Sequence, residues 1–238
     1  MENEGFRFKQ FTVNHNKCGM KVGVDGVLLG AWASVDGCRR VLDLGTGSGL
    51  IALMAAQRNC STVVDGIDID VDACRQAREN VAASPFAGRI YVIRTSLREY
   101  MPGRHGLYDL IVSNPPYFLM SLKGRDSSRT MARNSDSLPL YDIVTCGSKL
   151  LRKDGRIALI LPFDRLKDLK TVAEIGEMYI VRMTVVETVK GNEPKRVMVE
   201  LSTACSGPYT EEKLVIEDAR GVYSPAYIGL TKDFYLNF

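Results

Sequence analysis

The sequence lacks long apolar runs, and this absence limits where the protein can work. Runs such as Ile157 to Leu161 are typical of the longest, far short of the ~18 residues that a membrane span needs. The first residues, Met1 to Gly5, have neither the basic start nor the apolar stretch of a secretory signal. We therefore expect a cytoplasmic protein without a membrane partner.

Clustered cysteines and a large excess of charge are also missing. The six cysteines occur without a C-x-x-C pair and only two histidines are present, whereas zinc sites usually draw on clustered ligands. Disulfide frameworks belong to short secreted chains, so we expect reduced thiols and no metal. Because 31 Lys and Arg oppose 28 acidic residues, the charge of +3 excludes binding to nucleic acid through overall charge alone, although a local basic patch can exist.

Short runs rich in Val and Ile alternate with helical patterns from residue 40 onward, which predicts an α/β fold. We expect strands at 40–44, 62–68, 89–94, 108–113 and 156–161, and a strand pair at 183–189 and 196–201. We expect helices at 50–58, after Asp70, and from Ser137 through Leu151, with Gly155 beyond the end of the last one. This alternation favours a mainly parallel sheet covered on both faces. The 238 residues fit a single domain, with residues 1–38 as an N-terminal extension over the site and 39–238 as the core.

A glycine-rich turn follows the first expected strand. Gly45, Gly47 and Gly49 allow a sharp turn and let a ligand approach the backbone, but the third glycine comes one residue earlier than in the dinucleotide fingerprint. Asp43, at the end of the strand, would repel a pyrophosphate and instead suits an ammonium group. S-adenosylmethionine has an amino-acid end and no phosphate, so it is the predicted cofactor.

Asp68 ends the second expected strand, 19 positions after Gly49. A carboxylate at this place can accept both hydroxyls of a ribose diol, as in nucleotide-binding folds. The order of strand, glycines, helix, strand and acid favours a cofactor site over a simple tight turn.

The segment Asn114-Pro115-Pro116-Tyr117 follows the fourth expected strand, at the edge where open α/β sheets bind ligands. The side-chain carbonyl of Asn114 and the backbone carbonyl of Pro115 can each accept one N–H of an exocyclic amine, which directs the nitrogen lone pair at a methyl donor. Tyr117 offers a face on which a flipped base can stack. The alternative is a rigid Pro-Pro turn that Asn114 caps.

Together these motifs resemble class I S-adenosylmethionine-dependent methyltransferases of the branch that modifies amino groups. The sequence further resembles the bacterial tRNA1(Val) adenine-N6 methyltransferases in Phe11-Thr-Val13, in Met20 through Trp32 and in Leu230 through Tyr235. The resemblance implies a Rossmann-like fold with a mainly parallel seven-stranded sheet, an antiparallel C-terminal strand and helices on both faces. It also implies N6-methylation of the tRNA adenosine just 3′ of the valine anticodon.

The resemblance places Gly45, Gly47 and Asp68 against the cofactor and Asp25 near its methionine end. Related enzymes often carry an acid after the third strand that binds the adenine amino group, but Thr95-Ser96-Leu97 has none, so Ser96 or the backbone of Leu97 is expected there. The full set of expected cofactor residues is Asp25, Asp43, Gly45, Thr46, Gly47, Asp68, Ile69, Ser96, Leu97 and Asn114.

A long polar connection after Tyr117 and a second basic segment are the expected contacts for tRNA. Their basic residues are Lys123, Arg125, Arg129 and Arg133 in the first and Lys195 and Arg196 in the second. A solvated charged loop is the alternative for the first of them. The sequence does not separate a monomer from a weak dimer.

Three other functions fit parts of this pattern. A glutamine-N5 methyltransferase acting on a release factor uses the same turn, but only about 38 residues precede the first strand and they lack a helical-bundle pattern. A ribosomal-RNA guanine-N2 methyltransferase is excluded only by analysis of the product. A non-catalytic RNA-binding module has no need of the turn from Asn114 to Tyr117.

Overall fold

A large mixed sheet organises the protein. The computed structural model describes residues 5–18, 21–100, 107–115, 138–204 and 207–238. Its sheet strands are β3 (Arg40–Leu44), β4 (Val63–Asp68), β5 (Ile90–Arg94), β6 (Tyr108–Ser113), β7 (Leu151–Pro162), β8 (Tyr179–Val189), β9 (Arg196–Ser202), β10 (Thr210–Ala219) and β11 (Val222–Tyr223). Within the described residues their order across the sheet is β11-β10-β8-β9-β7-β6-β3-β4-β5.

Most neighbouring strands of this sheet are parallel. The pairs from β5 across to β7 are parallel, as is the pair of β8 and β10. Strand β9 runs antiparallel to both β7 and β8, and β11 runs antiparallel to β10. The mainly parallel sheet with an antiparallel strand near the C-terminus is therefore confirmed, as is the strand pair of β8 and β9.

The expected number of seven strands is wrong for the described residues, because β10 and β11 extend the sheet to nine. Strand β10 begins with the exposed run Thr210-Glu-Glu-Lys213, and Leu214 is its one fully buried residue. Its place comes from backbone pairing with β8 rather than from an apolar pattern.

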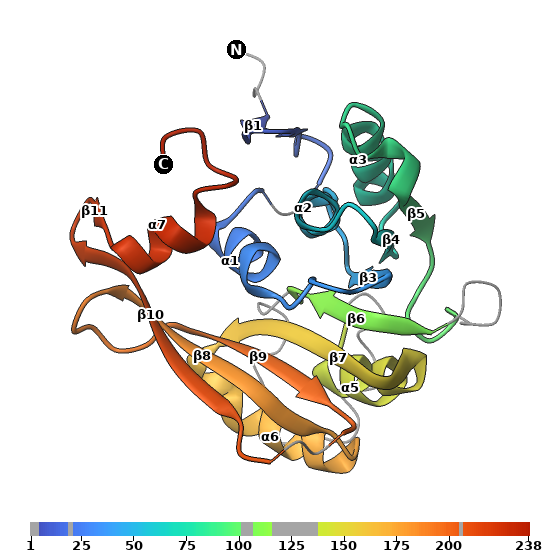
Figure 1. Ribbon diagram of the computed structural model, residues 1–238. Coiled ribbons are helices and arrows are strands. Elements are labelled where there is room, and N and C mark those ends of the chain that lie inside the picture. The colour runs from blue at the N-terminus through green and yellow to red at the C-terminus, as the bar shows by residue number, and fades with distance from the viewer. Residues whose placement is uncertain (1–4, 19–20, 101–106, 116–137, 205–206) are drawn as a thin grey trace, which may run out of the picture.

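Helices cover both faces of the sheet. They are α1 (Val24–Trp32), α2 (Leu50–Arg58), α3 (Val71–Ala82), α5 (Leu140–Gly147), α6 (Leu166–Ile175) and α7 (Pro225–Thr231), with short 3-10 turns at Ala87–Arg89, Ser148–Leu150 and Phe163–Arg165. Helices α1, α2, α3 and α7 lie on one face, and α5 and α6 lie on the other (Figure 1). Alternate residues of β3 enter the two buried clusters, since Val41 packs with α1 and α2 while Leu42 packs with α5 and α6.

The helix expected from Ser137 through Leu151 is shorter than the apolar pattern suggested. Helix α5 ends at Gly147, Leu151 already belongs to β7, and Gly155 lies inside that strand. Ser137 itself lies outside the described residues. Fully buried strands and buried helix faces both consist of apolar runs, so periodicity alone placed this boundary four residues too late.

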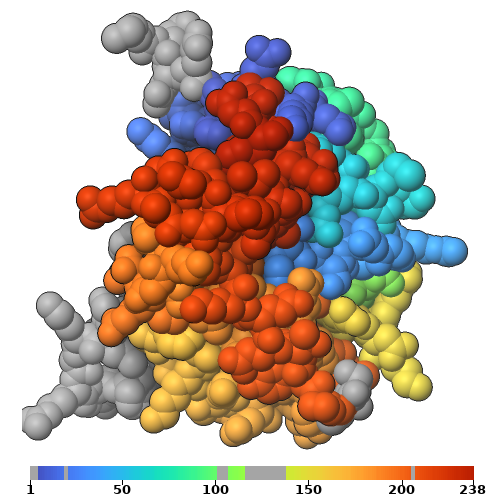
Figure 2. All heavy atoms as spheres, turned by 60° about the vertical axis from the view of Figure 1, so that its left-hand side comes forward, coloured from blue at the N-terminus to red at the C-terminus, as the bar shows by residue number. Residues whose placement is uncertain are grey.

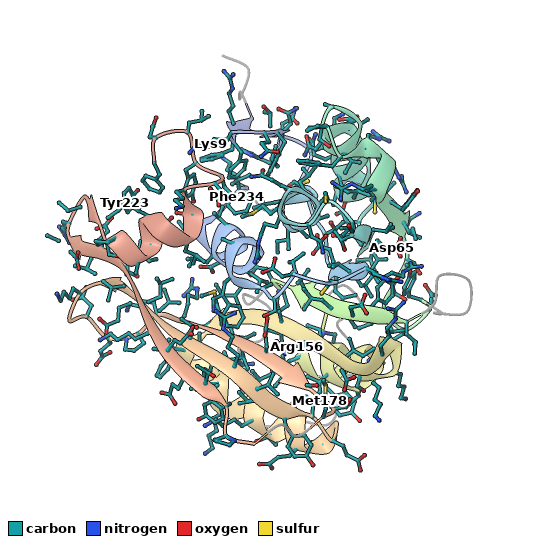
Figure 3. The ribbon with its side chains drawn as sticks, viewed as in Figure 1. Lys9, Asp65, Arg156, Met178, Tyr223 and Phe234 are labelled. Atoms are coloured by element: carbon teal, nitrogen blue, oxygen red, sulfur yellow. The ribbon has the colours of Figure 1, made fainter. Side chains whose placement is uncertain are left out.

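The first and last described segments pack together on the face of α1. A small hairpin of β1 (Phe6–Arg7) and β2 (Thr12–Val13) lies beside the segment that follows α7, as Figure 2 shows. The backbone N–H of Lys9 donates to the carbonyl of Phe234 at 2.8 Å, and these two residues lie next to each other in Figure 3. Residues near both ends of the chain therefore pack together on the face of the sheet that carries α1.

A buried polar network fixes the register of the central strands at the edge opposite the site. Asp65 of β4 accepts from the hydroxyl of Tyr108 on β6 at 2.6 Å and forms an ion pair with Arg40 at the start of β3 (Figure 3). Burial raises the pKa of Tyr108 well above its ordinary value, so its hydroxyl remains a donor. Strands β3, β4 and β6 are therefore bound together on the side of the sheet where β3 and β6 begin.

Candidate active site

The carboxyl ends of β3, β4, β5 and β6 meet at one edge of the sheet. Leu44, the last residue of β3, lies between Ile67 of β4 and Ser113 of β6. The hydroxyl of Ser113 donates to the carbonyl of Leu44 at 2.8 Å, which holds the loop after β6 beside the loop after β3. Open α/β sheets bind their ligands outside the carboxyl ends of the strands. The site lies where the chain leaves two neighbouring parallel strands toward opposite sides of the sheet.

The loop after β3 has a backbone that requires glycine. Gly45, Gly47 and Gly49 have φ angles of +69°, +55° and +83°, which other residues adopt only with strain. The N–H groups of Gly45 and Thr46 both donate to the carbonyl of Ile67, at 2.9 and 3.0 Å, so the loop is attached to β4. The expectation that these glycines form a sharp turn into α2 is confirmed by this geometry.

Gly66 in β4 is a part of the site that the sequence analysis missed. A Cβ built on Gly66 would lie 2.8 Å from Oγ1 of Thr46, closer than such atoms approach. The signal that was available is a glycine inside an otherwise apolar strand, which often marks close approach of another chain segment. Here the approaching segment is the glycine loop.

Asp43 presents an unusual buried carboxylate directly beneath that loop. The side chain is 1% exposed, and its Oδ2 accepts from Oγ1 of Thr46 at 2.7 Å and from the N–H of Ala52 at 3.2 Å. Its Oδ1 is buried and has no hydrogen-bond partner in the described structure. Burial raises the pKa of Asp43 from its ordinary value of 3.8 to about 7. A buried acceptor of this kind is costly unless a ligand supplies the donor, and a cationic ammonium suits it.

The carboxylate of Asp68 is held in place by two backbone groups. Its Oδ2 accepts from the N–H of Gly47 at 2.9 Å, and its Oδ1 accepts from the N–H of Asp70 at 3.0 Å. Each oxygen keeps a further lone pair, so the pair can accept both hydroxyls of a diol. Ile69, next in the chain, is 40% exposed and offers an apolar surface at the same edge.

The turn after β5 is held by hydrogen bonds between Ser96 and Glu99. The hydroxyl of Ser96 donates to Oε2 of Glu99 at 3.0 Å and accepts from the N–H of Glu99 at 3.3 Å, while the side chain of Leu97 is buried in the cluster of α5 and α6. Glu99 is therefore the acid nearest to Ser96 in this turn, and the sequence analysis overlooked it. The S-x-x-E spacing of a capping box was the available signal.

Asn114 and Pro115 follow β6, and the side chain of Asn114 lies near the start of α1. A Cβ built on Gly26 of α1 would lie 3.0 Å from Cδ2 of Leu50 and 4.0 Å from Nδ2 of Asn114. Helix α1 therefore passes so close to Leu50 that a larger residue at position 26 would displace the Leu50 side chain. The remaining expected site residues after Pro115 lie outside the described residues, namely Pro116, Tyr117, Lys123, Arg125, Arg129 and Arg133.

Asp25 and Arg196 were assigned to different ligands, and the structure brings them together. Nε of Arg196 lies 2.7 Å from Oδ2 of Asp25, in a half-buried ion pair that joins the first turn of α1 to the start of β9. Lys195, next to Arg196, is exposed. The pair thus links a residue expected near the cofactor to the basic segment expected to bind RNA.

None of the helices in the described ranges has the length and apolar character needed to cross a lipid bilayer. In the same ranges, no group of three or more His, Cys, Asp or Glu side chains is placed to hold a metal ion.

The fold and the edge residues define a methyltransferase, and comparison with known proteins agrees. Residues 27–162 match the methyltransferase small domain family. A "tRNA1(Val) (adenine(37)-N6)-methyltransferase" of Parabacteroides distasonis is 51% identical over 99% of both chains. Proteins with the same name are 47% identical in Bacteroides fragilis, over 97% of both chains, and 44% identical in Aeromonas hydrophila, over 98% of both. The chain belongs to the family of the tRNA1(Val) (adenine(37)-N6)-methyltransferases.

Solved structures support the same fold. A predicted O-methyltransferase, protein Atu636 from Agrobacterium tumefaciens, superposes with a TM-score of 0.68 over 88% of this chain and 96% of its own, at 19% identity. TrmN from Thermus thermophilus is 29% identical with a TM-score of 0.52, over 69% of this chain and 44% of its own. The expected Rossmann-like methyltransferase fold is confirmed.

Proposed function

We propose that the protein transfers a methyl group from S-adenosylmethionine to N6 of adenosine 37 in tRNA1(Val). The observation that carries this proposal is the position of Asn114 and Pro115 beside the glycine loop, fixed by the hydrogen bond from Ser113 to Leu44. The names of relatives that are 44–51% identical over nearly the whole chain support the choice of substrate. A tRNA substrate also favours a cytoplasmic location.

The hydrogen-bonding groups at the carboxyl ends of the strands fit the chemical groups of S-adenosylmethionine. The unpartnered Oδ1 of Asp43 would accept from the ammonium group, and Asp68 would accept from the two ribose hydroxyls. Gly45, Thr46 and Gly47 would line the amino-acid end together with Asp25, and Ile69 would cover the adenine, with Ser96 and Leu97 at its rim. When bound, the cofactor supplies a methyl group that its sulfonium makes electrophilic.

The turn after β6 would prepare the amine that receives this methyl group. An amine on a conjugated ring is a weak nucleophile because its lone pair is delocalised into the ring. The side-chain carbonyl of Asn114 and the carbonyl of Pro115 would each accept one N–H, which makes the nitrogen pyramidal and fixes the direction of its lone pair. No group with a pKa near 7 is needed as a base, since the proton leaves after the methyl arrives. Tyr117 would stack on the flipped base.

Basic residues near this turn would hold the RNA backbone. Lys195 is exposed and precedes Arg196, and we assign phosphate contacts to these two residues and to Lys123, Arg125, Arg129 and Arg133. Because Arg196 also pairs with Asp25, RNA contact at this point reaches the first turn of α1. We propose that the protein acts as a monomer or a weak dimer.

The experiment that tests this function is an assay of product identity. The protein is incubated with labelled S-adenosylmethionine in parallel reactions that contain unmodified total tRNA, ribosomal RNA or a release factor, and the labelled nucleoside or amino acid is identified after digestion. N6-methyladenosine confined to position 37 of tRNA1(Val) is the expected result. Label in N2-methylguanosine of ribosomal RNA, in a glutamine of a release factor, or in no product at all would overturn it.

A further inference from the structure

A segment that precedes α1 lies against the glycine loop through one buried amide. Asn80 of α3 is 1% exposed, and its Oδ1 accepts from the N–H of Asn14 at 3.0 Å. Its Nδ2 donates to the carbonyl of Asn14 and to the carbonyl of Ser48, both at 2.8 Å. One side chain therefore joins the N-terminal segment and the loop, which are far apart in the sequence.

Two further side chains of α3 hold the same segment, residues 14–18. Oε1 of the buried Gln76 accepts from the N–H of Lys17 at 3.2 Å. Nζ of Lys17 lies 2.6 Å from Glu79, although this ion pair is exposed and contributes little to stability. Asn80, Gln76 and Glu79 share one face of α3, so the helix presents a row of polar groups to this segment.

The segment continues beside the acid that we assign to the ribose. The half-buried thiol of Cys18 lies within electrostatic reach of Asp68, Asp70 and Asp72. Burial, together with these negative charges, raises the pKa of Cys18 to about 11. Residues 14–18, which we call the wall, are therefore held against α3, and their last residue, Cys18, lies on the side of Asp68.

We propose that Asn80 is a positioning residue that locks this wall onto the glycine loop and so builds one rigid cradle for the cofactor. Asn80 acts through the carbonyls of Ser48 and Asn14 and does not touch the cofactor. The energetic reason is preorganisation: a loop and a wall that are already fixed need not be ordered when the ligand binds. The inference rests on the proposed cofactor site.

The chain offers a matched control for Asn80. Asn59, which ends α2 at the opposite edge of the sheet, donates from Nδ2 to the carbonyls of Val35 and Cys38 at 3.0 and 2.8 Å. Its Oδ1 accepts from the N–H of Ser61 at 2.9 Å. Asn59 thus makes the same three kinds of hydrogen bond as Asn80, but far from the cofactor edge.

The first test compares Asn80→Asp with Asn59→Asp in the full chain. Each change keeps the acceptor and places a carboxylate against two carbonyls, so both variants should lose thermal stability, and the buried Asn80→Asp should lose more than the half-buried Asn59→Asp. Calorimetry with S-adenosylhomocysteine should show at least tenfold weaker binding to Asn80→Asp and a change below twofold for Asn59→Asp. Equal binding by the two variants would overturn the positioning role and leave Asn80 as a stabiliser of the fold.

The second test follows the wall directly through the thiol of Cys18. In a Cys60→Ser background, peptide mass spectrometry measures how fast a thiol reagent modifies Cys18. S-adenosylhomocysteine should slow this reaction in the parent protein, whereas Asn80→Asp should react faster and show no protection. Unchanged protection in Asn80→Asp would contradict the proposal. If that variant does not fold, Gln76→Leu replaces it, with the same two measurements and the same expected directions.

These outcomes separate the inference from the proposed function. If the parent protein does not bind S-adenosylhomocysteine, the assigned cofactor site itself fails. If the parent binds and Asn80→Asp binds equally well, the cofactor site stands and only the role of Asn80 fails.

Discussion

Gly47 donates its backbone N–H to Oδ2 of Asp68 at 2.9 Å, so the glycine loop orients the acid at the end of the next strand. The loop and the acid therefore act as one unit, and neither has to be rearranged when a diol binds. This relationship explains why a motif of glycines and a distant aspartate occur together in the sequence.

Replacing Asp68 tests this unit. Asp68→Ala should weaken S-adenosylmethionine binding by about 2 kcal/mol or more, because charged hydrogen bonds to both hydroxyls are lost. Isothermal titration calorimetry measures the change. Asp70→Ala is the control: Asp70 caps α3 by accepting from the N–H groups of Asp72 and Ala73, so this variant should lose about 1 kcal/mol of stability and keep its affinity. Equal loss of affinity in both variants would show that Asp68 has no special role.

Asn114 should affect the rate of methyl transfer far more than it affects binding. Asn114→Ala removes one of two acceptors for the target amine, and loss of one such preorganised contact typically costs 10²–10³ in rate, or about 3–4 kcal/mol. Single-turnover methyl transfer should fall by this factor, while the dissociation constants of cofactor and tRNA change little. Transfer within threefold of the parent rate would show that Asn114 only shapes the turn.

The buried Asp43 should make the stability of the ligand-free protein depend on pH. Since its pKa rises from 3.8 to about 7 on folding, the folded state binds the proton more tightly than the unfolded state. The contribution of Asp43 to the free energy of unfolding therefore falls by at most about 4 kcal/mol as pH rises from about 4 to about 7. Above pH 7 this contribution is constant.

Asp43→Asn isolates this contribution. The variant avoids a buried charge, so its free energy of unfolding in urea should exceed that of the parent at pH 8 and converge with it toward pH 4. The same variant should bind S-adenosylmethionine more weakly, because an amide cannot pair with the ammonium as a carboxylate does. Parallel stability curves for the two proteins would contradict the assignment.

Lys195 should contribute to tRNA binding through charge alone. Lys195→Gln should reduce the slope of log affinity against log salt by about one unit, with cofactor affinity unchanged. The exposed Lys153 is a suitable control because it lies near the start of β7, at the opposite edge of the sheet, and Lys153→Gln should leave the slope as it is. A filter-binding titration over a range of salt concentrations measures both.

The part of the fold that depends on local pattern could be predicted from the sequence. Strands β3 to β6 alternate with α2 and α3, whose apolar faces and Asp70 cap are visible in the residues themselves. The glycine loop and Asp68 were predictable for the same reason, since conformational freedom and charge are properties of single residues.

Features that depend on tertiary contact could not be predicted in this way. Strand β10 has one buried residue, Leu214, and is placed by pairing with β8. The ion pair of Asp25 with Arg196 joins residues that are 171 positions apart, and no local pattern reports it. Asn80 looks like an ordinary helix residue until the carbonyls that it binds are known.

The position of β6 beside β3 has a consequence for how this protein can change over evolutionary time. Everything assigned to the cofactor except Asp25, Asn114 and the wall of residues 14–18 comes from the contiguous stretch between β3 and the turn after β5, whereas the acceptor turn and the basic segments come from β6 onward. Mutations that alter which amine is accepted can therefore accumulate after β6 without disturbing the stretch that holds the methyl donor. The donor part and the acceptor part of the site therefore meet between these two neighbouring strands.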